Sequence, residues 1–269
     1  MPLAVCATPI GNLDDVTLRV LAELGEADVV LCEDTRHTQV LLRRHGIRAK
    51  ALLSYHRHNE AARGDELLAR LRAGDRVALV SDAGIPLVND PGARLVHDAA
   101  AAGIEVTVLP GASAVESALV VSGLAADGYR FLGWLPRKEV ERRALWDELA
   151  AVAVPVVAFE SPRRLAASLA SLASVDPTRP VAVCRELTKR HEDVIRGTAS
   201  ELAERFADGT RGEVTVVVGA AAAPVGRDDD VAIAAVEELV AAGAPRRAAV
   251  DVVARLTGAS RNMLYRATL

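Results

Sequence analysis

Residues 77–111 read VALVSDAGIPLVNDPGARLVHDAAAAGIEVTVLPG, and this stretch decides the fold class of the chain. The apolar run 77–80 predicts a strand over 77–81, the pattern of 91–102 predicts a helix, and 105–109 predicts a second strand. The loop before the helix contains more Gly, Pro, Asn and Asp than a plain connection requires. Because ligands bind beyond the carboxyl ends of strands in open α/β sheets, we expect this loop to line a binding crevice.

The same alternation of apolar runs and helical periods extends over most of the chain. It predicts strands at 3–7, 28–32, 51–54, 77–81 and 105–109, with helices near 16–25, 35–45, 60–73, 91–102 and 113–123. A second set follows, with strands at 130–134, 154–159, 181–185, 193–196 and 212–219 and helices near 139–150, 162–173 and 198–208. Alternating strands and helices favour a mostly parallel sheet covered on both faces, so the predicted fold class is α/β.

Composition shifts divide the chain into three parts. We predict an N-terminal α/β domain at 1–124, a second α/β domain at 125–222 and a helical segment at 230–269, with 220–230 (AAAAPVGRDDD) as a linker. The helical segment has periods at 231–242, 246–256 and 260–267. The last two resemble a helix-turn-helix pair in which Ser260 caps the second helix. A helical bundle that binds no ligand is an equally open interpretation.

The composition excludes several classes of protein. Of the 269 residues, 51% are hydrophobic and 25% charged, as in an ordinary soluble domain, and we expect no membrane partner because no apolar stretch is long enough to span a bilayer. The start of the chain has no secretory pattern. Cys6, Cys32 and Cys184 are far apart and lie in strand-like runs, which indicates buried thiols, a cytoplasmic protein and no metal site. No GxGxxG, Walker A or HExxH motif is found.

The net charge of −4 conceals a basic segment. Residues 35–72 contain nine Lys or Arg against three acids, and also four of the six histidines. Such a segment in an acidic chain is a candidate surface for phosphates. The alternative is a solvated helix face, because several of these arginines fall in amphipathic patterns.

Loops with polar or turn-forming residues follow every predicted strand of the first set, and we expect them to line one edge of the sheet. For Asp82 the alternative is an ordinary strand–helix turn. Asp34 and Thr35 are alternatively helix caps, and for Thr35 capping is the favoured role. Ser113 is also a natural cap. Besides the 77–111 stretch, the loops are TPIGN (8–12), EDTR (33–36), SYHRHNE (54–60) and PGAS (110–113).

Together these motifs resemble a known family. In chain order they are TPIGNLDDVTLRVL, CEDTR, SYHRHNE, VSDAGIPLVNDPG, LPGAS, FLGWLPRK, FESPRRL, CRELTKRHED, GEVTVVV and LYRATL. The set is similar to the tetrapyrrole-methylase superfamily, and more narrowly to its branch of 16S rRNA (cytidine 2′-O-ribose) methyltransferases. The resemblance covers essentially the whole chain. Tetrapyrrole-modifying relatives have a more glycine-rich first loop, so TPIGN favours the RNA branch.

The resemblance implies a two-domain methylase, usually a homodimer, that binds S-adenosylmethionine in the cleft between its domains. The implied product is 2′-O-methylcytidine at position 1402 of 16S rRNA, in the decoding centre of the small ribosomal subunit. Methyl transfer from a sulfonium requires alignment and a water-poor cleft but no metal. The residues implied to contact the cofactor are Pro9, Gly11, Asp82, Ala83, Gly84, Ser113 and Thr215.

The residue that accepts the 2′-hydroxyl proton is not decided by the sequence. Lys189 or Arg36 would lower the pKa of the hydroxyl, and Glu186 or a histidine would accept the proton; Asp34 and Glu60 are further candidates. For Glu186 and Lys189 the alternative is a local ion pair. Because the chain has few aromatic residues, we expect RNA to be bound through phosphates and shape rather than on a broad stacking platform. The RNA-binding candidates are His56, Arg57, His58, Arg137, Lys138, Arg163 and Arg261.

Two rival hypotheses remain open. A methylase for a tetrapyrrole or other small acceptor predicts a closed acceptor pocket and no salt-sensitive RNA binding. A non-enzymatic ribosome-binding factor predicts no affinity for the methyl donor. Fold alone does not separate these alternatives, because one fold supports many activities.

Overall fold

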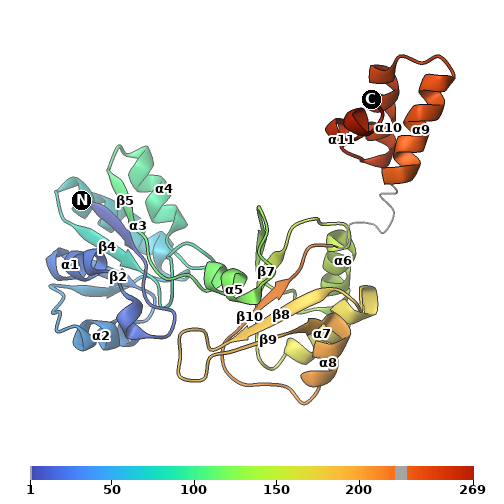
Figure 1. The fold of residues 1–269 in the computed structure, drawn as a ribbon. Helices are drawn as coiled ribbons and strands as arrows, with labels where there is room; N and C mark the ends of the chain where they lie inside the picture. The colour runs from blue at the N-terminus through green and yellow to red at the C-terminus, as the bar shows by residue number, and fades with distance from the viewer. Residues whose placement is uncertain (1, 222–228) are drawn as a thin grey trace.

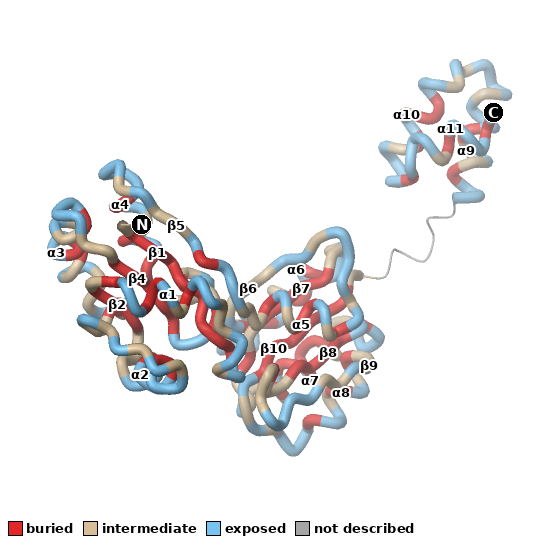
Figure 2. The backbone as a smooth tube through the Cα atoms, turned by 60° about the vertical axis from the view of Figure 1, so that its left-hand side comes forward, coloured by how far each residue is buried: buried red, intermediate tan, exposed pale blue. Residues whose placement is uncertain are grey.

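The computed structural model describes residues 2–221 and 229–269, and its N-terminal part is a five-stranded parallel sheet (Figure 1). The strand order is β3-β2-β4-β1-β5. All residues of β1, β2 and β4 are buried, as expected for central strands covered on both faces (Figure 2). The strands are β1 (Leu3–Cys6), β2 (Val29–Cys32), β3 (Leu52–Ser54), β4 (Val77–Val80) and β5 (Val106–Leu109).

Helices cover both faces of this sheet. Buried residues of α1 and α2, such as Leu24 and Leu41, pack in one core cluster, and those of α3 and α4, such as Leu67 and Leu95, pack in another. The helical elements are η1 (Leu13–Asp15), α1 (Leu18–Glu26), α2 (Thr35–Arg44), α3 (Glu60–Arg72) and α4 (Ala93–Ala101).

The favoured capping role of Thr35 is wrong. Asp34 is the N-cap of α2, and its Oδ1 accepts a hydrogen bond from the Arg36 amide at 2.8 Å. Thr35 is the first helical residue. A carboxylate is as good an N-cap acceptor as a hydroxyl, so residue type alone did not separate the two neighbours.

The second sheet is mixed rather than parallel. Its order is β6-β7-β10-β8-β9; β6 and β7 are parallel, whereas β10 runs antiparallel to both of its neighbours and β9 antiparallel to β8. Helices α6, α7 and α8 pack in one core cluster with it. The elements are β6 (Arg130–Trp134), α6 (Glu139–Leu149), β7 (Val156–Glu160), α7 (Leu165–Val175), β8 (Pro180–Arg185), β9 (Asp193–Thr198), α8 (Ala199–Arg205) and β10 (Val214–Val218).

Helix α5 (Ala114–Ser122) joins the two halves. It follows β5 in the chain, yet its residues Val115, Ala118 and Leu119 pack in one cluster with residues of β7, β8 and β10 (Figure 1). Ile10, from the loop after β1, belongs to the same cluster. The second sheet is therefore covered on this face by a segment that the sequence groups with the first domain.

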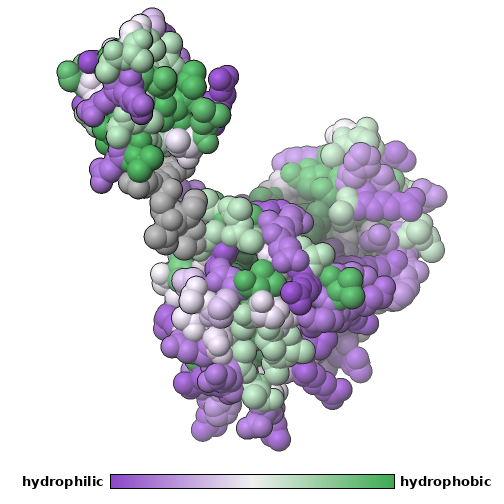
Figure 3. Space-filling model, turned by 90° about the vertical axis from the view of Figure 1, so that its right-hand side faces the viewer, coloured by the Kyte–Doolittle hydropathy of each residue, from purple (hydrophilic) through white to green (hydrophobic). Residues whose placement is uncertain are grey.

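The C-terminal helices α9 (Asp229–Ala241), α10 (Arg246–Thr257) and α11 (Arg261–Ala267) form a core of their own. Ser260 caps α11 through a hydrogen bond from the Met263 amide, as expected. Apolar residues also lie on the surface of this unit (Figure 3). Most of the predicted linker, residues 222–228, lies outside the described residues. Among the described helices, none is both long and apolar enough for a membrane span.

Candidate functional site

A cavity of about 970 Å³ lies between the two sheets. One wall comes from loops that follow all five strands of the first sheet and from the start of α5. The other comes from β6, β7, β8 and β10, from the residues after β7 and β8, and from those just before β10. This is the carboxyl edge of the first sheet, where ligands are expected. The residues that line it include Ile10, Glu33, Arg57, Ala83, Gly84, Val88, Asn89, Asp90, Ser113, Trp134, Phe159, Glu160, Glu186, Leu187, Lys189, Glu213 and Thr215.

The loop between β4 and α4 is fixed at its start by the first loop. The amide of Thr8 donates to the carbonyl of Gly84 at 2.8 Å, and the Gly84 amide donates back to Thr8 at 3.0 Å. The Ser81 hydroxyl also donates to the Gly84 carbonyl. Gly84 has a φ of 85°, which a residue with a Cβ rarely adopts. These bonds place two loops from neighbouring strands side by side at the cavity.

The rest of this loop has a strained backbone and is held by a hydrogen bond from another loop. Leu87 and Asn89 have positive φ angles of 71° and 68°. At Gly92, with a φ of 122°, an added Cβ would lie 2.6 Å from Leu79 Cδ2 in the core. Arg57 Nη2 donates to the Asn89 carbonyl at 2.7 Å. Strain of this kind persists only where the surroundings impose it, and it gathers at functional sites.

The cavity is acidic. Its lining contains five carboxylates against Arg57 and Lys189. Glu160 is buried and pairs with Arg164 at 2.6 Å, and two others pair with Lys189, so the acidic character rests on Glu33 and Asp90. Burial, together with the charges of Glu33 and Asp82, raises the pKa of Asp90 to about 6, while Arg57 opposes the shift. A site in which burial already penalises a carboxylate favours a cationic ligand. The carboxylates are Glu33, Asp90, Glu160, Glu186 and Glu213.

Glu186, Lys189 and Glu213 form a preassembled ion-pair cluster. Lys189 Nζ lies 3.1 Å from Glu186 Oε1 and 2.9 Å from Glu213 Oε2. The Glu213 amide, together with Lys189 and against burial, lowers the pKa of Glu186. Burial alone would lower the pKa of Lys189, but its bonds to the two glutamates outweigh burial and raise it. Lys189 is therefore held as an ammonium ion, a donor rather than a base.

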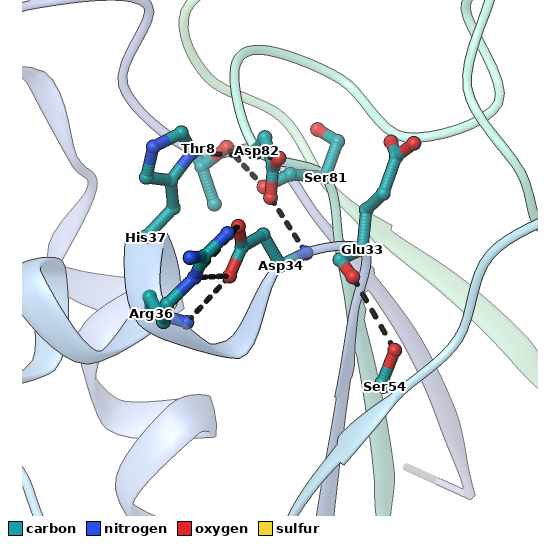
Figure 4. A network of polar contacts seen from close by, with 8 residues as sticks. All are labelled: Thr8, Glu33, Asp34, Arg36, His37, Ser54, Ser81 and Asp82. Carbon is teal, nitrogen blue, oxygen red and sulfur yellow. Dashed lines mark hydrogen bonds and ion pairs between the residues drawn. The ribbon is translucent and has the colours of Figure 1, made fainter.

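Asp82 and Asp34 organise the loops beside the cavity (Figure 4). Asp82 Oδ1 accepts from the Asp34 amide at 3.0 Å, and its Oδ2 lies 3.4 Å from His37 Nδ1. Asp34 pairs with Arg36 at 2.6 Å, and the side chain and amide of Arg36 lower the pKa of Asp34. The side chain of Glu33 extends away from this network (Figure 4). Asp82 thus connects the loops that follow β2 and β4.

The structure brings part of the predicted site together. Of the cofactor candidates, Ala83, Gly84, Ser113 and Thr215 line the cavity, whereas Pro9, Gly11 and Asp82 are outside the lining. Of the catalytic candidates, Glu186 and Lys189 line it, and Asp34, Arg36 and Glu60 do not.

Gly11 has a structural reason for its type. An added Cβ would lie 2.5 Å from Lys189 Cγ and 2.7 Å from Thr188 Oγ1, and the Asn12 amide donates to Thr188 Oγ1 at 2.9 Å. The first loop therefore needs glycine in order to approach the segment that carries Lys189.

The RNA-binding candidates occupy several loops. Arg57 lines the cavity, and the rings of its neighbours His56 and His58 meet edge to face at 5.8 Å. Arg137 and Lys138 lie between β6 and α6, Arg163 lies between β7 and α7, and Arg261 pairs with Asp251 on the helical unit.

Sequence reasoning did not single out Asp90 or Trp134, which both line the cavity. Asp90 lies in the loop after β4, which was expected to line a crevice, but Asn-Asp-Pro-Gly gave this carboxylate no role beyond a turn. Its burial depends on residues from other loops. Trp134 ends a strand, and no pattern in the sequence showed that its side chain faces the cleft.

The two α/β halves enclose an acidic cleft, which is the architecture expected of a two-domain methylase. Residues 2–203 match the sequence model of the family Tetrapyrrole (Corrin/Porphyrin) Methylases, and the chain belongs to this family. It is therefore a methyltransferase.

The chain is 44% identical to Ribosomal RNA small subunit methyltransferase I of Mesorhizobium japonicum, over 99% of this chain and 91% of that protein. It is 46% identical to the protein of the same name from Mycobacterium tuberculosis (strain ATCC 25618 / H37Rv), over 99% and 94%. A structure of uroporphyrin-III C-methyltransferase from Thermus thermophilus with S-adenosylhomocysteine shares the fold, at a TM-score of 0.55 and 20% identity, over 81% of this chain and 96% of that one.

Proposed function

We propose that this protein transfers a methyl group from S-adenosylmethionine to the 2′-oxygen of a cytidine ribose in 16S rRNA of the small ribosomal subunit, at position 1402. The observation that carries the proposal is the acidic cleft between the sheets, at the carboxyl edge of the first sheet. The relatives of 44–46% identity, which are named as small-subunit rRNA methyltransferases over nearly the whole chain, support the choice of RNA as acceptor.

The cavity fits the methyl donor in size and charge. Its volume is in the range of small-molecule sites. Bound S-adenosylmethionine supplies an electrophilic methyl group on a sulfonium, and it also carries an ammonium group. The carboxylates of Asp90 and Glu33 line the cavity and would attract the sulfonium and ammonium groups of the donor. Ile10, Val88 and Leu187 form apolar parts of the wall, which would exclude water from the reacting atoms.

Lys189 is the group that we assign to the acceptor hydroxyl. Its ammonium, held by Glu186 and Glu213, lies at the cavity and would lower the pKa of a ribose 2′-hydroxyl beside it, so that the hydroxyl gives up its proton to water as its oxygen takes the methyl group. The pKa of Glu186 is lowered, so Glu186 stays ionised and is a weak base. We therefore assign Glu186 the role of keeping Lys189 charged and in place, rather than that of accepting the proton. Asp34 and Arg36 hold the start of α2, outside the cavity lining.

The basic loops around the cleft are the proposed RNA surface. His56, Arg57 and His58 follow β3, and Arg137, Lys138 and Arg163 follow β6 and β7. Each of these strands borders the cavity with its end or with the loop after it, so the basic residues lie beside the cavity. Arg261 would add a contact from the helical unit. We further propose that the protein acts in the cytoplasm as a homodimer.

The test is methylation of defined acceptors. The purified protein is incubated with isotope-labelled S-adenosylmethionine and either unmodified small subunits, free 16S rRNA or uroporphyrinogen, and the products are mapped by mass spectrometry. Label on a single cytidine ribose at position 1402 is expected. Label on the tetrapyrrole, or no transfer to either RNA while the donor still binds, contradicts the proposal.

A further inference from the structure

Trp134 lies in the wall of the cavity and is also open to solvent, with 53% of its surface exposed. The chain's other tryptophan, Trp146, is only 3% exposed and lies in the core. A large aromatic ring left open to water at the mouth of a cavity is a candidate contact for a planar ligand.

The backbone places this ring through an irregularity in the sheet. Phe131 pairs with Val157 and Trp134 with Phe159, so β6 uses one more residue than β7 between the two pairs. Gly133, with a φ of 69°, lies at this bulge. Bulges redirect side chains and are frequent beside active sites.

Neighbouring groups hold the bulge and the ring. A Cβ on Gly133 would lie 3.2 Å from Asn89 Oδ1, so the strained β4–α4 loop lies directly against this bulge. The Trp134 ring meets Phe159 edge to face at 5.7 Å. Ordered in this way before a ligand arrives, the indole loses little entropy on binding.

We propose that Trp134 forms a nucleobase subsite, in which its indole stacks on the base of the acceptor nucleotide. The proposal rests on the proposed function. A ribose in folded RNA reaches an enclosed donor only if its nucleotide leaves the stack, and the exposed base then needs a new partner. A single indole serves one base, without the broad platform that the sparse aromatic content argues against.

The position favours the acceptor base over the adenine of the methyl donor. Trp134 is more exposed than any other large apolar residue of the lining, as suits a base that belongs to a large acceptor and enters from outside. Arg137 and Lys138 follow it three and four residues later in the chain and are suited to the phosphates on either side of the base.

The experiment uses tryptophan fluorescence, because the chain contains only two tryptophans. In a Trp146→Phe background, Trp134 is the sole reporter. A decoding-site RNA oligonucleotide is expected to quench its emission, and S-adenosylhomocysteine alone is not. If Trp146→Phe fails to fold, 5-fluorotryptophan in the wild-type chain gives two ¹⁹F resonances, of which only the Trp134 resonance should respond to RNA.

Kinetics supply the second readout. Trp134→Leu is expected to raise the KM for RNA about 10- to 100-fold, the range expected for one lost base–aromatic stack, with the affinity for S-adenosylmethionine unchanged. Trp134→Phe should restore most of the loss. Val140→Ala, at an exposed apolar position on α6, is the matched control and should behave as wild type.

Three outcomes overturn the subsite: quenching by S-adenosylhomocysteine alone, a wild-type KM in Trp134→Leu, or loss of donor binding in that variant. Failure of the proposed function looks different. If the wild type does not methylate the RNA but the RNA still quenches Trp134, the reaction is refuted and the subsite stands.

Discussion

Asp90→Asn should weaken binding of S-adenosylmethionine and abolish the pH dependence of that binding near pH 6. Asp90 is a partly buried carboxylate in an acidic cavity, with its pKa raised to about 6 by burial and by Glu33 and Asp82, against Arg57. Only its ionised form attracts a cation. A hydrogen bond to a charged group contributes about 1.5–3 kcal/mol, so losing the charge should reduce affinity about 10- to 100-fold.

The pH dependence follows from the same pKa. With a pKa of about 6, Asp90 is about 97% ionised at pH 7.5 and about 24% at pH 5.5, so the affinity of the wild type should fall about fourfold between these values. A bound cation lowers this pKa, and binding near pH 6 should therefore release a proton. Isothermal titration calorimetry in two buffers of different ionisation enthalpy measures both effects.

The stability of the donor-free protein should fall as the pH rises through about 6, whereas the affinity for the donor should rise. Because the folded-state pKa of Asp90 is raised, its contribution is most favourable below the ordinary value near 4 and is lost as the pH rises through about 6. Asp90→Asn should therefore raise the Tm at pH 7.5 while weakening binding. Asp208→Asn, at an exposed position after α8, is the control. Wild-type affinity in Asp90→Asn, or an affinity that stays constant from pH 7.5 to 5.5 in the wild type, would refute this reasoning.

Three further predictions concern the cleft. Lys189→Ala should lower kcat about 100-fold or more and leave donor affinity within a few fold, as measured by single-turnover methylation and calorimetry; equal losses in both would mean that Lys189 binds the donor. Gly92→Ala should lower the Tm, since its Cβ would overlap Leu79 and its φ of 122° is strained; an unchanged Tm in differential scanning calorimetry would show that the loop adapts. Asp82→Ala should weaken donor binding less than Asp90→Asn, because Asp82 acts through the Asp34 amide; calorimetry that ranks them in the reverse order would place Asp82 in the donor site.

Local patterns predicted the elements closely, because burial and helical period are local properties. The predicted strand 77–81 is Val77–Val80, and the predicted helix 139–150 is Glu139–Leu149. The direction of β10 and the transfer of α5 to the second sheet were not predictable from such patterns. An apolar run shows that a segment is buried but not against which partner, and α5 has a short connection to β5 that suggested the first sheet instead.

The site shows the same division. Loops at strand ends indicated the correct edge of the first sheet, and Gly84 and Ser113 line the cavity there. Glu186 and Lys189, candidates named with the family resemblance, line it from the second sheet. The depth at which Asp90 lies depends on contacts far apart in sequence.

The central claim is that the cleft between the sheets binds the donor and receives the ribose. A crystal structure with S-adenosylhomocysteine and a decoding-site RNA oligonucleotide tests it most directly. The account predicts the homocysteine sulfur in the cavity, its ammonium group facing Asp90, and a cytidine 2′-hydroxyl between that sulfur and Lys189. Ligand outside the cavity, or a ribose on the far side of either sheet, would contradict it.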